Sequence, residues 1–162
     1  MIEIIFLDVD GCLSDGGLWH TNLSDEAKRF DVKDGFGIVG WLSLGKKVAI
    51  ITGKSSKIVE NRAKELGIKR VYQGVKDKLK VAKEILQEEG LDFSRAAAIG
   101  DDYNDAKLLG AVAKSFKPND AMSNLNVDVV LQKCGGKGAV REMIEILIRE
   151  NGQEQEWLKR WF

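Results

Sequence analysis

The sequence predicts a single α/β domain built as a three-layer sandwich, in which a parallel, Rossmann-like sheet lies between two layers of helices. Short apolar runs of strand length alternate along the chain with longer segments whose apolar residues recur at helical spacing. This alternation favours a parallel sheet joined by right-handed crossovers. Several of the apolar runs end in acidic or hydroxyl side chains. A chain of 162 residues is long enough for one domain with a buried core.

The first half of the chain contains three predicted sheet strands and an inserted hairpin. The elements are, in order, a strand that starts at residue 4 and ends in Asp8 and Asp10, a β-hairpin over about 15–33 with arms at 18–20 and 27–32, a helix over 34–42, a strand over 47–52, a helix from Ser55 or Ser56 to 66, and a short strand over 70–72. Turn residues before the first arm and a polar tip at 21–26 predict the hairpin. Ser55 or Ser56 can cap the second helix, and Gly67 ends it.

The second half continues the alternation. Its elements are a helix over 76–89, a strand over 95–99, a short helix, a strand near 111–115, a turn of helix after Pro118, an apolar segment over 127–131, an amphipathic helix that follows Gly138 and runs to 150, and a tail over about 151–162. The helix over 76–89 is predicted from apolar residues at helical spacing. The strand over 95–99 ends, like the first strand, at a glycine and acidic residues.

The composition excludes several classes of protein. Lysine plus arginine equals aspartate plus glutamate at 25 each, so nothing suggests a partner such as nucleic acid. The N-terminus lacks the pattern of a signal peptide, and no apolar run approaches the ~18 residues of a membrane span. Cys12 and Cys134 are far apart and show no metal-ligand spacing, which fits a reducing compartment. We therefore expect a cytoplasmic protein that does not contact a membrane.

Polar groups recur where the predicted strands end. Asp8 and Asp10 lie two residues apart at the end of the first strand, so both can face one site. Two such carboxylates either hold a cation, or act as a nucleophile and an acid/base pair, or do both. The groups at the other strand ends are Thr52, Lys78, Asp101, Asp102 and Asp105. In a parallel sheet these ends share one edge, where ligands of open α/β sheets bind.

Phosphoryl transfer requires such a set of groups. Its catalysis depends mostly on positioning and on charge stabilisation around the equatorial oxygens of the transferred group. A carboxylate can attack phosphorus and form an aspartyl phosphate. Mg²⁺, which prefers oxygen ligands, neutralises the carboxylates so that an anionic substrate can approach. A hydroxyl and an ammonium group can then hold the transferred oxygens.

Four segments, in this order, resemble the motifs of the haloacid dehalogenase superfamily phosphatases. They are Asp8-Val9-Asp10-Gly11, Thr52-Gly53, Lys78, and Gly100-Asp101-Asp102 followed by Asp105. A closer resemblance, covering nearly the whole chain, is to the 3-deoxy-D-manno-octulosonate 8-phosphate phosphatase family. It is carried by residues 8–16, Val32-Lys33-Asp34-Gly35-Phe36-Gly37-Ile38, Ile50-Ile51-Thr52-Gly53, Tyr72-Gln73-Gly74 and residues 135–142. The resemblance implies a capless HAD-like domain, a Mg²⁺ cofactor, a homotetramer, and a step in lipopolysaccharide sugar synthesis.

The resemblance also implies a role for each matched residue. Asp8 is then the nucleophile, and Asp10 protonates the leaving sugar oxygen and later deprotonates the hydrolytic water. Thr52 and Lys78 hold the phosphoryl oxygens.

The same match implies a metal site. The metal ligands are then Asp8, the backbone carbonyl of Asp10, and Asp101. Asp102 and Asp105 support the site.

The residues expected to bind substrate include several lysines. The set is Gly11, Lys33, Gly53, Lys54, Lys137 and Arg141. Relatives usually carry arginine where this chain has Lys33, Lys54 and Lys137. Arginine offers a bidentate fork to a carboxylate or phosphate, whereas lysine offers a point charge. Charge complementarity to an acidic sugar phosphate is retained. The proline that commonly follows the last motif aspartate is also replaced, by Ala106-Lys107.

The chain has no room for a cap domain, because residues 12–51 hold only the hairpin and one helix. An open site would admit bulk water. The family's solution is to assemble subunits so that a neighbour covers each site, and we expect a tetramer of this kind. Trp19, His20 and Phe30 on the hairpin, and the aromatic residues of the tail, could supply interface contacts.

Other functions fit parts of this pattern. Within the enzyme class, the alternatives are a phosphatase for a nine-carbon keto acid phosphate and a broader sugar phosphatase. From another class, a signalling receiver module also uses an aspartyl phosphate, a threonine and a lysine, but its acidic pair precedes the acceptor aspartate. A catalytically silent binding subunit is a further alternative, although every catalytic position is filled here.

Overall fold

The protein is described by a computed structural model that covers residues 1–22, 26–159 and 161–162. Its centre is a parallel sheet of six strands in the order β5-β4-β1-β6-β7-β8. The strands are β1 (Ile4–Leu7), β4 (Lys47–Ile51), β5 (Arg70–Tyr72), β6 (Ala96–Ile99), β7 (Lys114–Lys117) and β8 (Val129–Val130). The chain runs outward from β1 to β5 and then returns to β6 on the other side of β1. The strand order therefore changes direction at β1, which is where ligands of such sheets bind.

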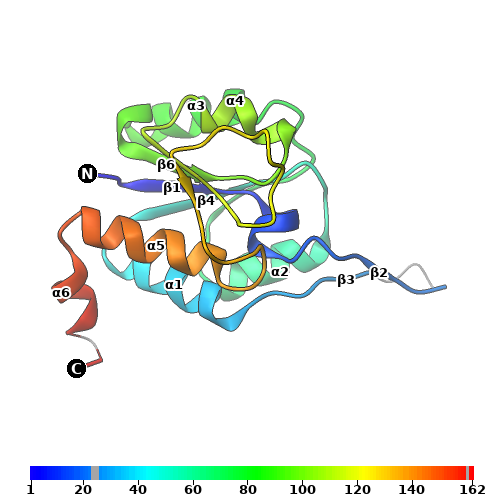
Figure 1. Ribbon diagram of the computed structural model, residues 1–162, viewed down its shortest axis with the longest axis horizontal. Coiled ribbons are helices and arrows are strands. Elements are labelled where there is room, and N and C mark those ends of the chain that lie inside the picture. Colours follow the sequence, from blue (N-terminus) through cyan, green and yellow to red (C-terminus); the bar gives the residue numbers. More distant parts are fainter. Residues whose placement is uncertain (23–25, 160) are drawn as a thin grey trace.

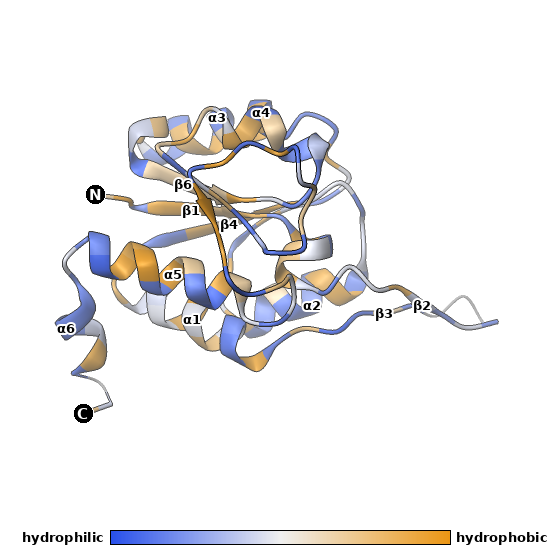
Figure 2. Ribbon diagram, viewed as in Figure 1, coloured by the Kyte–Doolittle hydropathy of each residue, from blue (hydrophilic) through white to orange (hydrophobic). Residues whose placement is uncertain are grey.

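Helices cover both faces of this sheet (Figure 1). One face carries α1 (Val32–Ser43), α2 (Lys57–Glu65) and α5 (Ala139–Glu150), and the other carries α3 (Lys78–Glu89) and α4 (Ala106–Leu109). Alternate residues of β1 supply the two cores: Ile5 and Leu7 pack toward α1 and α5, and Ile4 and Phe6 pack toward α3. The apolar strands and inward helix faces are visible in Figure 2. The predicted three-layer α/β sandwich is confirmed.

The hairpin projects from the body and is short. Its strands are β2 (Trp19–His20) and β3 (Glu26–Ala27), which pair antiparallel. The second arm was predicted over 27–32, but Phe30 makes only an isolated bridge to Ser14, and α1 already begins at Val32. Asp31 caps α1 by accepting from the Lys33 amide at 2.8 Å, so the helix starts two residues earlier than the predicted start at residue 34. Residues 23–25 of the predicted tip lie outside the described residues.

Two expectations for the second half were wrong in detail. The strand near 111–115 is instead β7 at Lys114–Lys117, because Ala111 and Val112 continue the helical turn by donating to the Leu108 carbonyl. Pro118 begins a turn and not a helix; the Ala121 amide donates to its carbonyl at 3.2 Å. The chain end contains a short helix, α6 (Glu154–Leu158).

Capping also differs from the prediction at α2. Ser56 occupies the N-cap position, but its hydroxyl donates to Glu26 at 3.2 Å and makes no cap bond.

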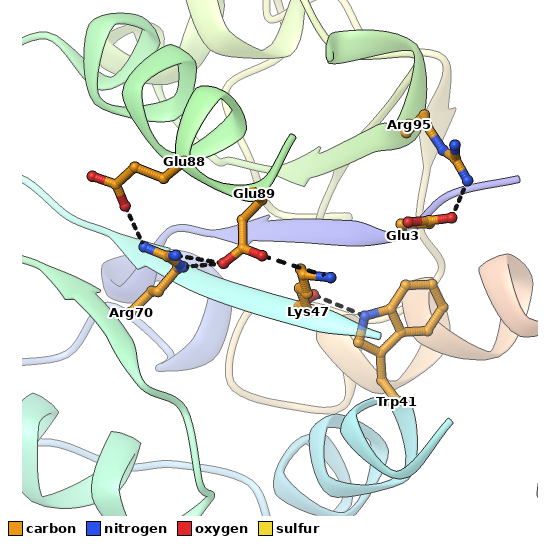
Figure 3. Close-up of polar contacts among 7 residues, drawn as sticks. All are labelled: Glu3, Trp41, Lys47, Arg70, Glu88, Glu89 and Arg95. Carbon is orange, nitrogen blue, oxygen red and sulfur yellow. Dashed lines mark hydrogen bonds and ion pairs between the residues drawn. The ribbon is translucent and has the colours of Figure 1, made fainter. Parts of the chain in front are cut away.

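The amino-terminal edge of the sheet is held by ion pairs (Figure 3). Arg70 of β5 pairs with Glu88 and Glu89 at the end of α3, and Lys47 of β4 also reaches Glu89. These contacts lie at the opposite end of the strands from the polar residues Asp8 and Thr52. No helix within the described ranges is long and apolar enough to cross a membrane.

Candidate active site

Three of the four predicted catalytic residues, Asp8, Asp10 and Thr52, line one cleft at the carboxyl ends of β1, β4 and β6. The cleft has a volume of about 360 Å³. It is lined by Asp8, Asp10, Thr52, Gly53, Lys54, Asp101, Asp102 and Asn104. The groups come from three separate strand ends, so the parallel sheet alone brings them together.

The chain turns sharply after β1. The strand β1 stops at Leu7, directly before Asp8, and Val9–Leu13 form one π-type turn (η1) closed by the Ser14 amide, which donates to the Val9 carbonyl at 2.9 Å. Gly11 has φ +92°, which side chains rarely adopt. A Cβ at Gly11 would also collide with the Asp101 carboxylate. Gly11 therefore allows Asp101 to approach the loop that carries Asp8 and Asp10.

A second glycine loop packs against this turn. The Gly136 amide donates to the Cys12 carbonyl at 2.9 Å. A Cβ at Gly135 would overlap the Gly11 carbonyl, and one at Gly136 would overlap the backbone of Asp15. The two backbone segments are thus in direct contact, and the catalytic turn is held from behind.

Lys78 lies between two carboxylates, one of which is the cleft residue Asp8. Its Nζ is 2.6 Å from Asp8 Oδ1 and 2.5 Å from Asp105 Oδ1, and its side chain is 2% exposed. Burial lowers the pKa of Lys78, but Asp8 and Asp105 outweigh it, so the pKa is raised and the ammonium stays charged. Burial raises the pKa of Asp8 to about 6, an effect that Lys78 partly offsets and Asp105 increases.

Asp105 also shapes the loop after β6. Its Oδ2 accepts from the backbone amides of Asp101 at 3.0 Å and Asp102 at 3.3 Å. Asp102 in turn accepts from the Tyr103 amide at 2.7 Å and begins the short helix η3 (Tyr103–Asp105). One buried aspartate therefore positions both Lys78 and the acidic loop.

The charge and the donor atoms of the cleft fit a Mg²⁺ site. Asp8 and Asp101 carboxylate oxygens and the Cys12 sulfur lie within 4.8 Å of one another. Burial, with Asp8 and Asp105 nearby, raises the pKa of Asp101 to about 7. Among the described residues, none makes a hydrogen bond or ion pair with the Asp101 side chain. Lys78 balances only part of the negative charge of these carboxylates, so they fit a hard cation that takes oxygen ligands.

The predicted substrate-binding residues do not all gather in this cleft. Gly53 and Lys54 line it, whereas Lys33 is exposed on the first turn of α1. Lys137 lines a separate hollow beside the hairpin. Arg141 lies 4.9 Å from the Trp157 ring centroid. The four cations among the predicted substrate-binding residues therefore do not all line one cleft within a single chain.

Two residues at the site were missed by the sequence analysis. Asn104 lines the cleft, but in the sequence it is one polar residue among acids. Lys28, from the hairpin, donates to Asp10 Oδ1 at 2.6 Å. No motif or spacing marks Lys28, because its partner is 18 residues away and the contact depends on how the hairpin returns to the body.

The comparisons with known proteins agree with this geometry. A model of the haloacid dehalogenase-like hydrolases matches residues 37–112. The chain is 39% identical over 157 residues to the 3-deoxy-D-manno-octulosonate 8-phosphate phosphatase KdsC of Escherichia coli (strain K12), covering 96% of this chain and 84% of that protein. The KdsC of Yersinia pestis is 38% identical over 149 residues, with 91% and 80% covered. Neither relative is a receiver module.

Solved structures give the same result for the fold. The structure of 3-deoxy-D-manno-octulosonate 8-phosphate phosphatase from Moraxella catarrhalis, in complex with magnesium ion, phosphate ion and KDO, superposes with a TM-score of 0.96 at 34% identity. The match covers 99% of this chain and 94% of that one. By identity and coverage, the chain belongs to the 3-deoxy-D-manno-octulosonate 8-phosphate phosphatase family of haloacid dehalogenase-like hydrolases.

Proposed function

We propose that this protein is a Mg²⁺-dependent phosphomonoesterase that hydrolyses 3-deoxy-D-manno-octulosonate 8-phosphate through an aspartyl phosphate on Asp8. The observation that carries the proposal is the buried Asp8–Lys78–Asp105 group beside Asp101, at the strand end where the family has its motif. Lys78 holds Asp8 charged and fixed, as a nucleophile requires. The similarity to enzymes that are named for this substrate supports the choice of ester.

The proposed reaction has two displacements at phosphorus. In the first, the Asp8 carboxylate attacks phosphorus, and the bond to the sugar oxygen breaks as Asp10 gives that oxygen a proton. In the second, Asp10 takes a proton from water, the water oxygen attacks phosphorus, and the Asp8 carboxylate is released. Thr52 and Lys78 hold the phosphoryl oxygens during both displacements.

The metal site is part of the proposal. Asp8, Asp101 and the backbone carbonyl of Asp10 would hold Mg²⁺, which when bound neutralises the carboxylates and lets an anionic ester approach. Asp102 and Asp105 support these ligands, and Asp105 does so through its contacts to Lys78 and the Asp101 amide.

The substrate end of the cleft carries positive charge. Lys54 lines the cleft next to Gly53 and can pair with the acid group of the sugar. Lys33, Lys137 and Arg141 lie outside the cleft of their own chain, so in this proposal they meet substrate only in an assembly.

We also propose a cytoplasmic homotetramer in which neighbouring subunits cover each open cleft. The projecting hairpin supports this, because it extends away from the body (Figure 1) and its Trp19 is 73% exposed. Both cysteines are free, which suits a reducing compartment. The reaction would then supply the sugar for lipopolysaccharide synthesis.

A substrate panel tests the activity. Phosphate release is measured from 3-deoxy-D-manno-octulosonate 8-phosphate, a nine-carbon keto acid 9-phosphate and common hexose phosphates, each with Mg²⁺ and with EDTA. The highest kcat/KM is expected for the eight-carbon ester and no turnover with EDTA. A higher kcat/KM for another ester would identify that ester as the substrate. Turnover in EDTA would contradict the proposed requirement for Mg²⁺.

The phosphoenzyme has its own test. Each in-line displacement inverts phosphorus, so two displacements leave its configuration unchanged. With an ester made chiral by oxygen isotopes, net retention is expected in the released phosphate. Net inversion would mean direct attack by water and would rule out the aspartyl phosphate.

A further inference from the structure

The hairpin reaches the catalytic turn through one lysine. Lys28 follows β3, and its Nζ is 2.6 Å from Asp10 Oδ1 and 3.3 Å from Glu26 Oε1. None of the Lys28 side chain is exposed. A covered ammonium group requires anionic or carbonyl partners, because burying it unpaired costs several kcal/mol, roughly. The position of Lys28 is therefore determined by these two carboxylates.

The second carboxylate is itself anchored to the body. Glu26 Oε2 accepts from the Ser56 hydroxyl at 3.2 Å, and the Ser56 amide donates to Gln73 Oε1 at 2.8 Å. Ser56 follows the Thr52–Lys54 segment that forms one wall of the cleft. Lys28 thus links Asp10 to the loop before α2 through Glu26.

The chemistry of the contact restricts the proton on Asp10. An ammonium group has three donors and no acceptor. When Lys28 donates to Oδ1, a proton carried by Asp10 must sit on Oδ2. The side chain of Asp10 is 26% exposed and lines the cleft, so a proton on Oδ2 remains available to a bound ester.

We propose that Lys28 is a positioning residue for Asp10, which it holds by one oxygen so that the other oxygen exchanges the proton with the leaving group. Lys28 acts through Asp10 and does not touch the reacting atoms. Lys78 holds Asp8 in the same way, by donating to its Oδ1. The inference rests on the proposed function, because it takes from it the acid/base role of Asp10.

The proposal predicts a dependence on the leaving group. A sugar alkoxide leaves only if it is protonated, whereas p-nitrophenolate leaves without a proton. The value of kcat/KM reports the first displacement alone, since departure of the leaving group ends that part of the reaction. Loss of Lys28 should therefore lower kcat/KM strongly for the sugar phosphate and weakly for p-nitrophenyl phosphate. The second displacement uses Asp10 with any substrate, so kcat should fall for both.

The experiment measures both esters in wild type and in Lys28→Met. The expected loss in kcat/KM is about 10²-fold or more for the sugar phosphate and under about 10-fold for the aryl ester. Lys28→Arg keeps a charged donor and should recover part of the loss. Lys57→Met is the matched control, because Lys57 is an exposed lysine whose ion pair within the described part of the chain is with Glu60.

The outcomes separate the inference from the proposed function. Equal losses for the two esters mean that Lys28 has only a structural role, and this overturns the inference while the enzyme activity stands. A wild type that hydrolyses neither ester overturns the proposed function and the inference with it. Circular dichroism checks folding of Lys28→Met; if it is unfolded, Lys28→Gln, which cannot hold a positive charge at Asp10, is measured in its place and must show the same unequal losses.

Discussion

Asp8 combines two properties that rarely occur together, because it is 7% exposed and yet has to be charged to react. Burial favours its neutral form and raises its pKa to about 6, while Lys78 favours the anion. Lys78 also pairs with Asp105, so the group of three carries one net negative charge next to Asp101. A cation in the cleft would remove this excess, which is why metal binding and nucleophile activation belong to the same few atoms.

Asp8→Asn should abolish turnover and leave the fold intact. The amide keeps the shape of the carboxylate but cannot form the acyl phosphate, so kcat should fall by roughly four orders of magnitude or more. Circular dichroism and thermal unfolding should match wild type, because Lys78 keeps Asp105 as its partner. Asp92→Asn, an exposed capping residue far from the cleft, is the control. A near-normal rate in Asp8→Asn would exclude Asp8 as the nucleophile.

Single residues of the site differ in how far the sequence could predict them. Asp8, Thr52 and Asp101 each follow a buried strand, so local pattern and the parallel sheet suffice to bring them together. Lys28 and Asn104 could not be predicted in this way. Lys28 reaches Asp10 because the irregular second arm of the hairpin lies close to the turn after β1. The path of that arm depends on tertiary packing and not on a periodic sequence pattern.

At the scale of elements, α1 and α5 are joined by one buried aspartate. Asp34 in α1 accepts from the backbone amides of Arg141 at 2.8 Å and Gly138 at 3.3 Å, which are free donors at the start of α5. Burial outweighs these hydrogen bonds and raises the pKa of Asp34 to about 6. Asp34 of α1 therefore helps to position α5, the helix that follows the loop of Gly135 and Gly136.

This pKa predicts how stability changes with pH. Between about pH 4 and 6 the folded protein holds a proton on Asp34 that the unfolded chain has released, so the free energy of unfolding decreases as pH rises, by roughly 3 kcal/mol at most. Asp34→Asn does not titrate and should lack this contribution. Urea unfolding of both proteins across this range should show the variant gaining on wild type as pH rises. The opposite trend would mean that the helix amides outweigh burial.

The loop after β7 is organised by another buried lysine, Lys117. Lys117 Nζ donates to the backbone carbonyls of Met122 at 3.0 Å, Ser123 at 3.0 Å and Leu125 at 2.8 Å. The same loop contacts the site, since the Met122 amide donates to the Asp101 carbonyl at 2.9 Å. Lys117 is 7% exposed, so these carbonyls depend on it and not on water.

Lys117→Met should therefore destabilise the protein and weaken metal binding. Methionine has a similar length but no donors, and the unsatisfied carbonyls should cost about 2–4 kcal/mol in the free energy of unfolding. A looser loop should also weaken Mg²⁺ affinity, measured by calorimetry. Lys64→Met, an exposed lysine on α2, controls for loss of charge. Unchanged unfolding would show that the three hydrogen bonds are replaced by water.

Elements with strong patterns were predictable, and those that depend on packing were not. The apolar run of β4 and the helical spacing of α3 led to elements close to those observed. β7 was placed too early because Ala111 and Val112 have strand-like apolarity, although they complete a helical turn. A short apolar run cannot by itself distinguish these two structures, and the neighbouring chain decides.

At the scale of the whole molecule, the candidate active site and the largest group of ion pairs in the described residues lie at opposite edges of the sheet. The carboxyl edge carries the acidic cleft, and the amino edge carries the ion pairs of Arg70 and Lys47 with Glu89 (Figure 3). The hairpin leaves the body near the cleft, at the far end of the molecule from α6 and the C-terminus (Figure 1). The exposed side of this arm, with Trp19, is the surface on which we expect a neighbouring subunit to pack.

Removing the hairpin should separate the subunits and lower activity. We expect wild type to scatter light with four times the 18.0 kDa mass of one chain. Replacement of residues 19–27 by two glycines should give a monomer with poor turnover, because each cleft loses the cover of its neighbour. Asp8 and Lys78 lie outside the deleted segment, and thermal unfolding should show whether the body still folds. A monomer peak for the intact protein would contradict the tetramer.

The contact between the turn after β1 and Gly135–Gly136 limits how this chain can acquire a new substrate. Any side chain at either glycine would strike main-chain atoms of residues 11–15, so the turn can neither lengthen nor gain bulk. Variation can act on Lys54, which lines the cleft, and on the hairpin, neither of which is packed against this turn by a glycine. Descendants of this chain should inherit the reaction as one unit and change their choice of ester one rim residue at a time.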